Sequence, residues 1–156
     1  ESMLRNIRLW GRFQRFSGNV EYIFDVAHNV QAIEQFVATL AKLENNGVTH
    51  FVLGMLKTKE RAAVMNVLRA VVDNWYLSSV SARRGATSSE LHESLQEIGV
   101  VKGVAEFDTV FDALEAANEA SKPGDKIVAL GSFLVVSDAL RYIEKLDDLA
   151  GASRRG

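Results

Sequence analysis

Three side chains that can take part in chemistry lie within five consecutive residues, Asp25-Val26-Ala27-His28-Asn29. An acid, an imidazole and an amide follow the strand-like run 20–24 and precede residues 30–43, whose apolar spacing predicts a helix. In an open α/β sheet, ligands bind at the carboxyl ends of the strands, and a helix N-terminus there attracts anions. The segment therefore predicts a site for an anionic small molecule, and a nucleotide first.

Each of these residues also has an ordinary structural interpretation. His28 could be a satisfied structural histidine, Asn29 a helix N-cap and Asp25 a solvated strand end. The prediction of a binding site therefore depends on what the other strand ends carry.

Two cationic segments could bind phosphate. Arg12 stands before the first predicted strand, and its planar guanidinium matches phosphate oxygens. Lys57 or Lys59 could reach a phosphate after the strand 48–55. The alternatives are a surface arginine on an edge strand and a solvated helix start.

Two further loops have polar groups beside glycine. Ser132 follows Gly131 after the last strand, where the glycine lets a ligand approach the backbone. Its hydroxyl could bind a carboxylate or phosphate, or cap the next helix. Arg84 belongs to the basic loop 83–86, which could bind an anionic substrate or be solvated.

The composition is that of an ordinary globular domain. The 156 residues are 47% hydrophobic and 24% charged, with a net charge of −2, so we expect neither a nucleic-acid nor a membrane partner. The absence of cysteine excludes disulfides and thiolate chemistry and fits a cytoplasmic protein. No apolar run approaches the roughly 20 residues that span a bilayer, and no signal peptide is visible.

Strand and helix patterns alternate along the chain, which favours a mostly parallel open sheet with helices on both faces. We expect one domain over residues 1–150, a disordered tail over 151–156, and Asp108 as a helix cap. Residues 1–3 read as a cloning remnant in front of a piece of a longer protein. Strands are predicted at 12–16, 20–26, 48–55, 75–80, 102–107 and 126–130, and helices at 30–43, 58–72, around 91–98, around 110–117 and at 135–145.

Several common motifs are missing. The chain has no GxxxxGK[ST] phosphate loop, no GxGxxG dinucleotide pattern and no GxSxG nucleophile elbow. His28, His50 and His92 have no metal-ligand spacing, so no metal site is predicted, and the last two are expected to be structural or solvated.

Taken in order, the segments resemble the C-terminal domain of bifunctional dihydrofolate synthase/folylpolyglutamate synthase, in the Mur ligase superfamily. The resemblance runs from about residue 11 to residue 136, and it implies a Rossmann-like fold. The matching stretches are Gly-Arg-Phe-Gln at 11–14, Ile-Phe-Asp-Val-Ala-His-Asn at 23–29, Gly-Met-Leu at 54–56, Val-Val-Asp-Asn-Trp-Tyr at 71–76, Arg-Gly-Ala-Thr at 84–87 and Gly-Ser-Phe at 131–133.

The resemblance also implies an activity. The family uses ATP to join glutamate to dihydropteroate or to a folate through an acyl phosphate, which the glutamate amine attacks. The phosphate loop, the Mg²⁺ ligands and most of the pterin pocket belong to an N-terminal domain outside this chain. That domain is the expected partner, and the isolated chain is expected to be inactive.

The resemblance implies roles for individual residues. Arg12 would contact the phosphates, and Asp25 the ribose or the neighbouring phosphate region. The nucleotide group as a whole is Arg12, Asp25, Asn29 and Lys59. The glutamate group is His28, Ser132 and Arg84.

Four positions depart from the family pattern. Trp10 and Val30 stand where proline is usual, which adjusts loop shape. Thr58 replaces the first acid of an acid-lysine-acid pattern, and Leu134 replaces a common histidine, so these two put the roles of Lys59 and of the 131–134 turn in question. The alternatives are a free-standing, non-catalytic binding module and the same lobe of a peptidoglycan-precursor ligase.

Overall fold

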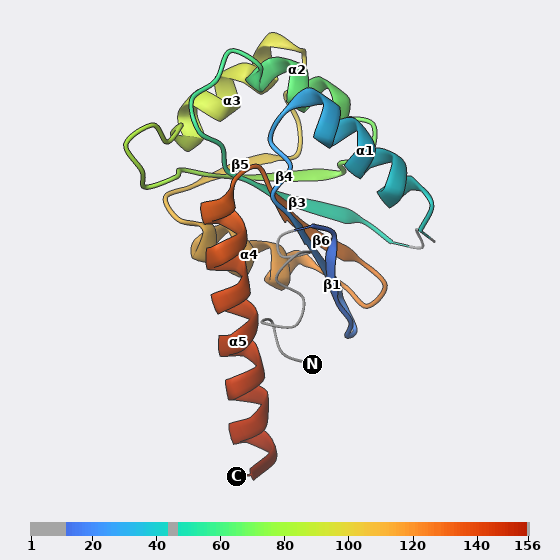
Figure 1. Ribbon diagram of the computed structural model, residues 1–156. Helices are drawn as coiled ribbons and strands as arrows, with labels where there is room; N and C mark the ends of the chain where they lie inside the picture. The colour runs from blue at the N-terminus through green and yellow to red at the C-terminus, as the bar shows by residue number, and fades with distance from the viewer. Residues whose placement is uncertain (1–11, 44–46, 156) are drawn as a thin grey trace.

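The described part of the chain, residues 12–43 and 47–155 of the computed structural model, contains one six-stranded sheet with helices on both faces (Figure 1). The predictions for residues 1–3, Trp10 and Gly11 fall outside it. The elements are β1 (Gln14–Phe16), β2 (Glu21–Asp25), α1 (Val30–Ala41), β3 (Thr49–Leu53), α2 (Arg61–Leu68), β4 (Asn74–Ser78), α3 (Ser88–Glu97), β5 (Val104–Phe107), α4 (Val110–Ala120), β6 (Lys126–Leu130) and α5 (Phe133–Arg155).

The strand order β1-β2-β6-β3-β4-β5 places the last strand of the chain in the middle of the sheet. Strands β2 to β6 run parallel, and β1 pairs antiparallel with β2 at one edge. In the register, Leu130 at the end of β6 pairs with Asp25 of β2 and with Leu53 of β3. The segments that follow these three strands therefore start side by side.

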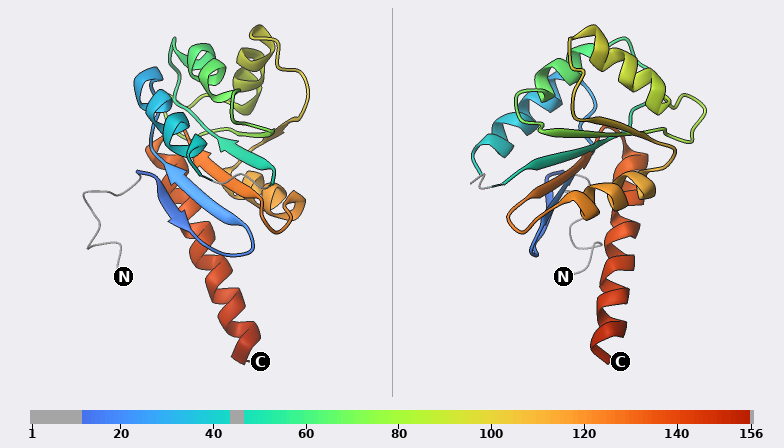
Figure 2. Two further views of the ribbon diagram at one scale, coloured as in Figure 1. Left: turned by 90° about the vertical axis from the view of Figure 1, so that its right-hand side faces the viewer. Right: turned by 180° about the vertical axis from the view of Figure 1, so that it is seen from behind.

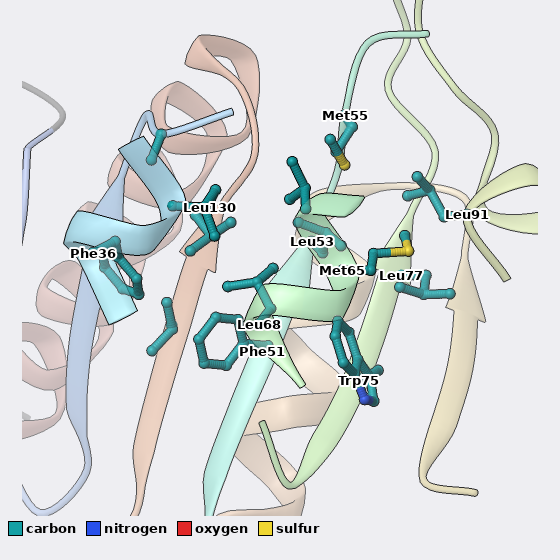
Figure 3. Packing of buried hydrophobic residues seen from close by; sticks show 14 of the residues in the cluster. Phe36, Phe51, Leu53, Met55, Met65, Leu68, Trp75, Leu77, Leu91 and Leu130 are labelled. Atoms are coloured by element: carbon teal, nitrogen blue, oxygen red, sulfur yellow. The ribbon is translucent and has the colours of Figure 1, made fainter. Parts of the chain in front are cut away.

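Each face of the sheet has its own apolar layer. Residues of α1, α2 and α3 pack with Phe51, Leu53 and Leu130, as Figure 3 shows. On the other face, α4 and α5 pack on Tyr22, Phe24 and neighbouring strand residues. The alternation of side chains along a strand supplies both layers, so the central strands read as continuous apolar runs.

The connections that follow β6 and its two neighbours lead to different faces of the sheet. Helices α1 and α2, which follow β2 and β3, cover one face, whereas α5, which follows β6, covers the opposite face (Figures 1 and 2). Because β6 lies between β2 and β3, the chain diverges at its carboxyl end. A crevice at such a point is where open α/β sheets bind ligands.

Local capping largely follows the sequence. Asn29 caps α1 by accepting a hydrogen bond from the Ala32 N–H, and Thr87 forms a capping box with Glu90 at α3. The prediction of Asp108 as a cap is wrong. Thr109 has the extended backbone of an N-cap and accepts from the Asp112 N–H, one residue later than expected.

Two helix lengths differ from the predictions. Helix α2 covers only Arg61–Leu68, because residues 56–60 form the turn at the sheet edge. Helix α5 starts at Phe133 and continues to Arg155, beyond residue 145, where we expected it to end, and beyond residue 151, where we expected the tail to begin. No proline interrupts this stretch, and a single helical glycine costs only about 1 kcal/mol. In Figure 1, α5 extends well beyond the sheet.

Among the helices described, none combines the length and the apolar character needed to cross a membrane.

A buried polar network holds the amino end of the sheet together. His50 contacts the Tyr76 hydroxyl through Nδ1 at 3.0 Å and Asp125 through Nε2 at 3.1 Å, which confirms its structural role. Asp125 also accepts hydrogen bonds from the Val48 and Lys122 N–H groups. Burial alone would raise the pKa of Asp125, but these backbone bonds and His50 outweigh burial and hold it below its ordinary value.

Asp125→Asn should lower the free energy of unfolding at pH 7 by about 3 kcal/mol, because the variant replaces a buried carboxylate that accepts three hydrogen bonds. A depressed folded-state pKa stabilises the fold above the ordinary value of 3.8, and this contribution is lost as the pH falls through the folded-state pKa. The difference between wild type and variant should therefore shrink below pH 4. Urea unfolding at pH 7 and pH 3 measures both effects, with exposed Asp147→Asn as control. Equal stabilities at pH 7 would contradict the account.

Candidate functional site

The loops after β2, β3 and β6 enclose a cavity of ≈ 410 Å³ at the point where the chain diverges. We call it the central cleft. Its lining residues are Val26, His28, Asn29, Met55, Leu56, Thr58, Glu60, Gly131, Ser132 and Phe133. Leu56 and Phe133 are exposed, which gives the cleft an apolar rim.

A second cavity of ≈ 320 Å³ lies beside the first, between the start of β1, the end of β2 and α1. We call it the edge cavity. Its lining residues are Arg12, Phe13, Asp25, Val26, Ala27, His28, Asn29, Ala32, Gln35, Phe36 and Thr39. The two cavities share Val26, His28 and Asn29, so these residues form a common wall.

The Asp25 carboxylate ties two backbone segments together. Oδ2 accepts from the Phe13 N–H at 3.0 Å, and Oδ1 accepts from the Ala27 N–H at 2.8 Å. Burial raises the pKa of Asp25. The two backbone hydrogen bonds and the charge of Arg12 lower it, but burial has the larger effect, so the pKa stays above its ordinary value. A carboxylate has about four acceptor sites, so Asp25 can still accept from a ligand hydroxyl.

Arg12 reaches the edge cavity next to a residue with unusual backbone geometry. Phe13 has φ +40°, a conformation that costs energy for a bulky residue. It is held there by the hydrogen bond to Asp25 and by ring packing on Phe36, with centroids 5.4 Å apart. Arg12 itself is exposed and lines the edge cavity, so its charge is available to an anion there.

His28 and Asn29 each make one hydrogen bond within the protein and keep a polar atom that can bind a ligand. The Nδ1 of His28 lies 3.1 Å from the Val26 carbonyl oxygen, so a hydrogen bond there requires the proton on Nδ1 and leaves Nε2 for a ligand. Asn29 uses its side-chain oxygen to cap α1 at 2.9 Å, as one of its two interpretations predicted. Its amide N–H₂ remains a donor beside the shared wall.

Gly131 and Ser132 form the floor of the central cleft. Gly131 has φ +114°, and a Cβ atom there would lie 2.2 Å from the Gly54 carbonyl oxygen, so only glycine lets β6 end so close to β3. The buried Ser132 hydroxyl accepts from the Val135 N–H at 3.2 Å and caps α5. Its own hydrogen can still be donated.

Sequence reasoning missed Glu60, whose carboxylate lines the central cleft. Its Oε1 accepts from the Val30 N–H at the start of α1, at 3.4 Å. This N–H is available because residue 30 is a valine and not a proline. Glu60 directly follows Lys59 beyond β3, so the same sheet-edge rule that selected Lys59 could have found it.

Lys59 and Arg84 are not brought to either cavity as lining residues. Both side chains are exposed. The Arg84 carbonyl oxygen accepts from the Lys57 N–H at 2.6 Å, and Leu56 forms a bridge with Gly85, so this basic loop supports the 55–60 loop through its backbone.

The remaining histidines lie elsewhere. His50 is in the buried network at the opposite sheet end, and His92 pairs with Glu106 at 2.6 Å between α3 and β5. Within residues 12–43 and 47–155, no group of three His, Asp or Glu side chains could hold a metal ion. The site is therefore built from single charged groups and helix starts.

The two cavities differ in what they can bind. The edge cavity offers a guanidinium, a carboxylate with spare acceptor sites and two phenylalanine rings, which suit a phosphorylated nucleoside. The central cleft offers a histidine, a hydroxyl, a carboxylate and the start of α5, which suit a small zwitterion. The shared wall places the two cavities next to each other.

Comparison with known proteins points to one family. Residues 11–133 match the family described as "Mur ligase, glutamate ligase domain". The dihydrofolate synthase/folylpolyglutamate synthase of Escherichia coli (strain K12) is 37% identical over 134 residues, which cover 86% of this chain. The same residues cover 30% of that relative, so the chain spans about 30% of its length.

Solved structures agree with the sequence comparison. E. coli FolC in complex with DHPP and ADP superimposes with a TM-score of 0.80 and 36% identity, over 88% of this chain and 32% of that one. A bifunctional folylpolyglutamate synthase/dihydrofolate synthase with Mn, AMPPNP and L-glutamate bound gives a TM-score of 0.79 and 32% identity, over 87% and 32%. These similarities confirm the predicted fold class.

Gly131→Ala should destabilise the fold by at least about 3 kcal/mol, because the methyl group needs space that the Gly54 carbonyl occupies and a strained positive φ. Gly151→Ala is the matched control. Nothing lies within 4 Å of a Cβ atom at that helical position, so this variant should be neutral or up to about 1 kcal/mol more stable. Urea unfolding compares the two, and a fully stable Gly131→Ala variant would contradict the geometry of the cleft floor.

Proposed function

Because the chain belongs to the Mur ligase family and matches its glutamate ligase domain, we propose that it is the C-terminal lobe of an ATP-dependent ligase. The ligase joins glutamate to dihydropteroate or to a folate through an amide bond. The observation that carries the proposal is the pair of adjacent cavities, one suited to a nucleotide and one to an amino acid, at the sheet edge.

In this proposal, the nucleotide binds at the edge cavity. Arg12 neutralises phosphate charge, Asp25 accepts from a ribose hydroxyl and the amide of Asn29 donates toward the phosphates. Three residues assigned to the nucleotide by resemblance, Arg12, Asp25 and Asn29, all line this cavity, which supports the assignment. The ADP and AMPPNP in the two similar structures are consistent with it.

The amino acid binds in the central cleft. His28 and Ser132 line it, and the family resemblance assigns both to glutamate. The Ser132 hydroxyl and the start of α5 favour a carboxylate. His28 and Asn29 belong to both cavities, so an acyl phosphate at the shared wall lies within reach of the amino group.

The metal ion is assigned to the rest of the protein. Mg²⁺ prefers several oxygen ligands, and both Asp25 oxygens already accept backbone hydrogen bonds. The described residues thus do not fit a Mg²⁺ site, although a similar structure contains Mn. The acyl donor, a dihydropteroate or folate, would be held mainly by the N-terminal domain. Lys59 and Arg84 stay predicted contacts for ligands that extend beyond the two cavities.

Arg12→Ala and His28→Ala in the full-length protein should each lower kcat/KM for the ligand concerned by at least about tenfold, because each variant removes a ligand contact. The Arg12 variant should mainly raise the KM for ATP, and the His28 variant the KM for glutamate. Steady-state release of ADP, with circular dichroism to verify folding, measures both. Arg69→Ala, at the exposed C-cap arginine of α2, is the control. Wild-type kinetics in both variants would remove these residues from the site.

The 156-residue chain alone should release no ADP when mixed with ATP, glutamate and dihydropteroate, because it has no GxxxxGK[ST] loop to hold the triphosphate. A coupled ADP assay against the full-length protein measures this. Amide formation by the isolated chain would contradict the proposed division of labour between the two domains.

A further inference from the structure

Glu60 is the only residue with a permanent charge among those that line the central cleft. The guanidinium of Arg12 and the carboxylate of Asp25 line the edge cavity instead. Glu60 is exposed at the mouth of this cleft, and its negative charge there repels the carboxylates of an amino acid and attracts its ammonium group.

The Glu60 carboxylate is directed away from its own helix. Glu60 is the N-cap residue of α2, with φ −89° and ψ 3°, yet its side chain makes no capping bond there. Its Oε1 instead accepts from the Val30 N–H at the start of α1. The Glu60 N–H is in turn held by the Thr58 hydroxyl at 3.3 Å, which orients the turn.

The Glu60 carboxylate can accept further hydrogen bonds. The bond to Val30 is long, at 3.4 Å, and engages only Oε1. Among the ion pairs between described residues, none involves Glu60. Oε2 can therefore accept from a cationic ligand without the loss of an existing bond.

The helix starts and the Glu60 carboxylate around the central cleft favour one orientation of a bound zwitterion. The start of α1 is already occupied by the Asn29 side-chain oxygen and by Glu60, so it no longer favours a second anion. Helix α2 also starts at the cleft, but the Glu60 carboxylate at its N-cap offsets its positive end. The start of α5, with Ser132, is therefore the helix start that favours a carboxylate. An ammonium group is thus attracted to the Glu60 side and a carboxylate to the Ser132 side.

We infer that Glu60 binds the ammonium group of the incoming amino acid and orients it in the central cleft. The inference rests on the proposed ligase function and adds a binding residue to it. A charge-assisted contact holds the amine next to the shared wall before it loses a proton and attacks.

The test uses the full-length protein with saturating ATP and acyl substrate. Glu60→Gln removes the charge but keeps an oxygen that can accept from the Val30 N–H, so it should raise the KM for glutamate about tenfold or more. The KM for ATP should change less than about twofold. Glutarate, which lacks the amine, is the probe for the rest of the cleft. Its inhibition constant against glutamate should stay within about twofold between wild type and variant.

Two control variants distinguish the effect of the Glu60 charge from the effect of its hydrogen bond to the start of α1. Val30→Pro removes the N–H that Glu60 accepts from but leaves the carboxylate, and proline suits the first position of a helix. The extended backbone of Asn29, with ψ 164°, tolerates a following proline. This variant and Glu34→Gln, an exposed glutamate on α1, should keep the wild-type KM for glutamate.

Each outcome decides the inference. An unchanged KM for glutamate in Glu60→Gln overturns it, as does an equal rise for glutamate and glutarate. An equal loss in Val30→Pro assigns Glu60 to helix capping and also overturns it. These results leave the proposed function intact. If the wild-type full-length protein consumes no ATP with glutamate, the proposed function fails, and the inference fails with it.

Discussion

The site depends on the insertion of β6 between β2 and β3. Because the three strands pair in parallel and end at the same level, the segments that follow them must separate within a few residues. Two turn toward α1 and α2, and the third turns toward α5 on the other face. The separation opens the central cleft, and Gly131 permits the close approach of β6 to β3 below it.

The polar groups around the cleft each carry a structural bond and keep capacity for a ligand. Asp25 accepts hydrogen bonds from the Phe13 and Ala27 N–H groups. Asn29 caps α1, and Ser132 caps α5. A side chain held in this way loses little further conformational freedom when a ligand binds. The same bonds that define the loops therefore preorganise the site, and substitutions there are expected to affect folding and binding together.

Much of this arrangement could be predicted from the sequence. Apolar runs at β3 and β6 indicated a buried parallel sheet, and the sheet-edge rule then placed residues 25–29 and 131–133 together. The pairing of Glu60 with Val30 could not be predicted, because the two residues are 30 positions apart and meet only through the strand order. The length of α5 was missed since its polar end carries no packing signal.

The central claim is that nucleotide and amino acid occupy the two adjacent cavities. A crystal structure of the full-length protein with a non-hydrolysable ATP analogue and L-glutamate tests it most directly. The account predicts nucleotide phosphate or ribose oxygens within hydrogen-bond distance of Arg12 and Asp25, and glutamate between Glu60 and Ser132. A nucleotide bound away from the edge cavity, or glutamate outside the central cleft, would contradict it.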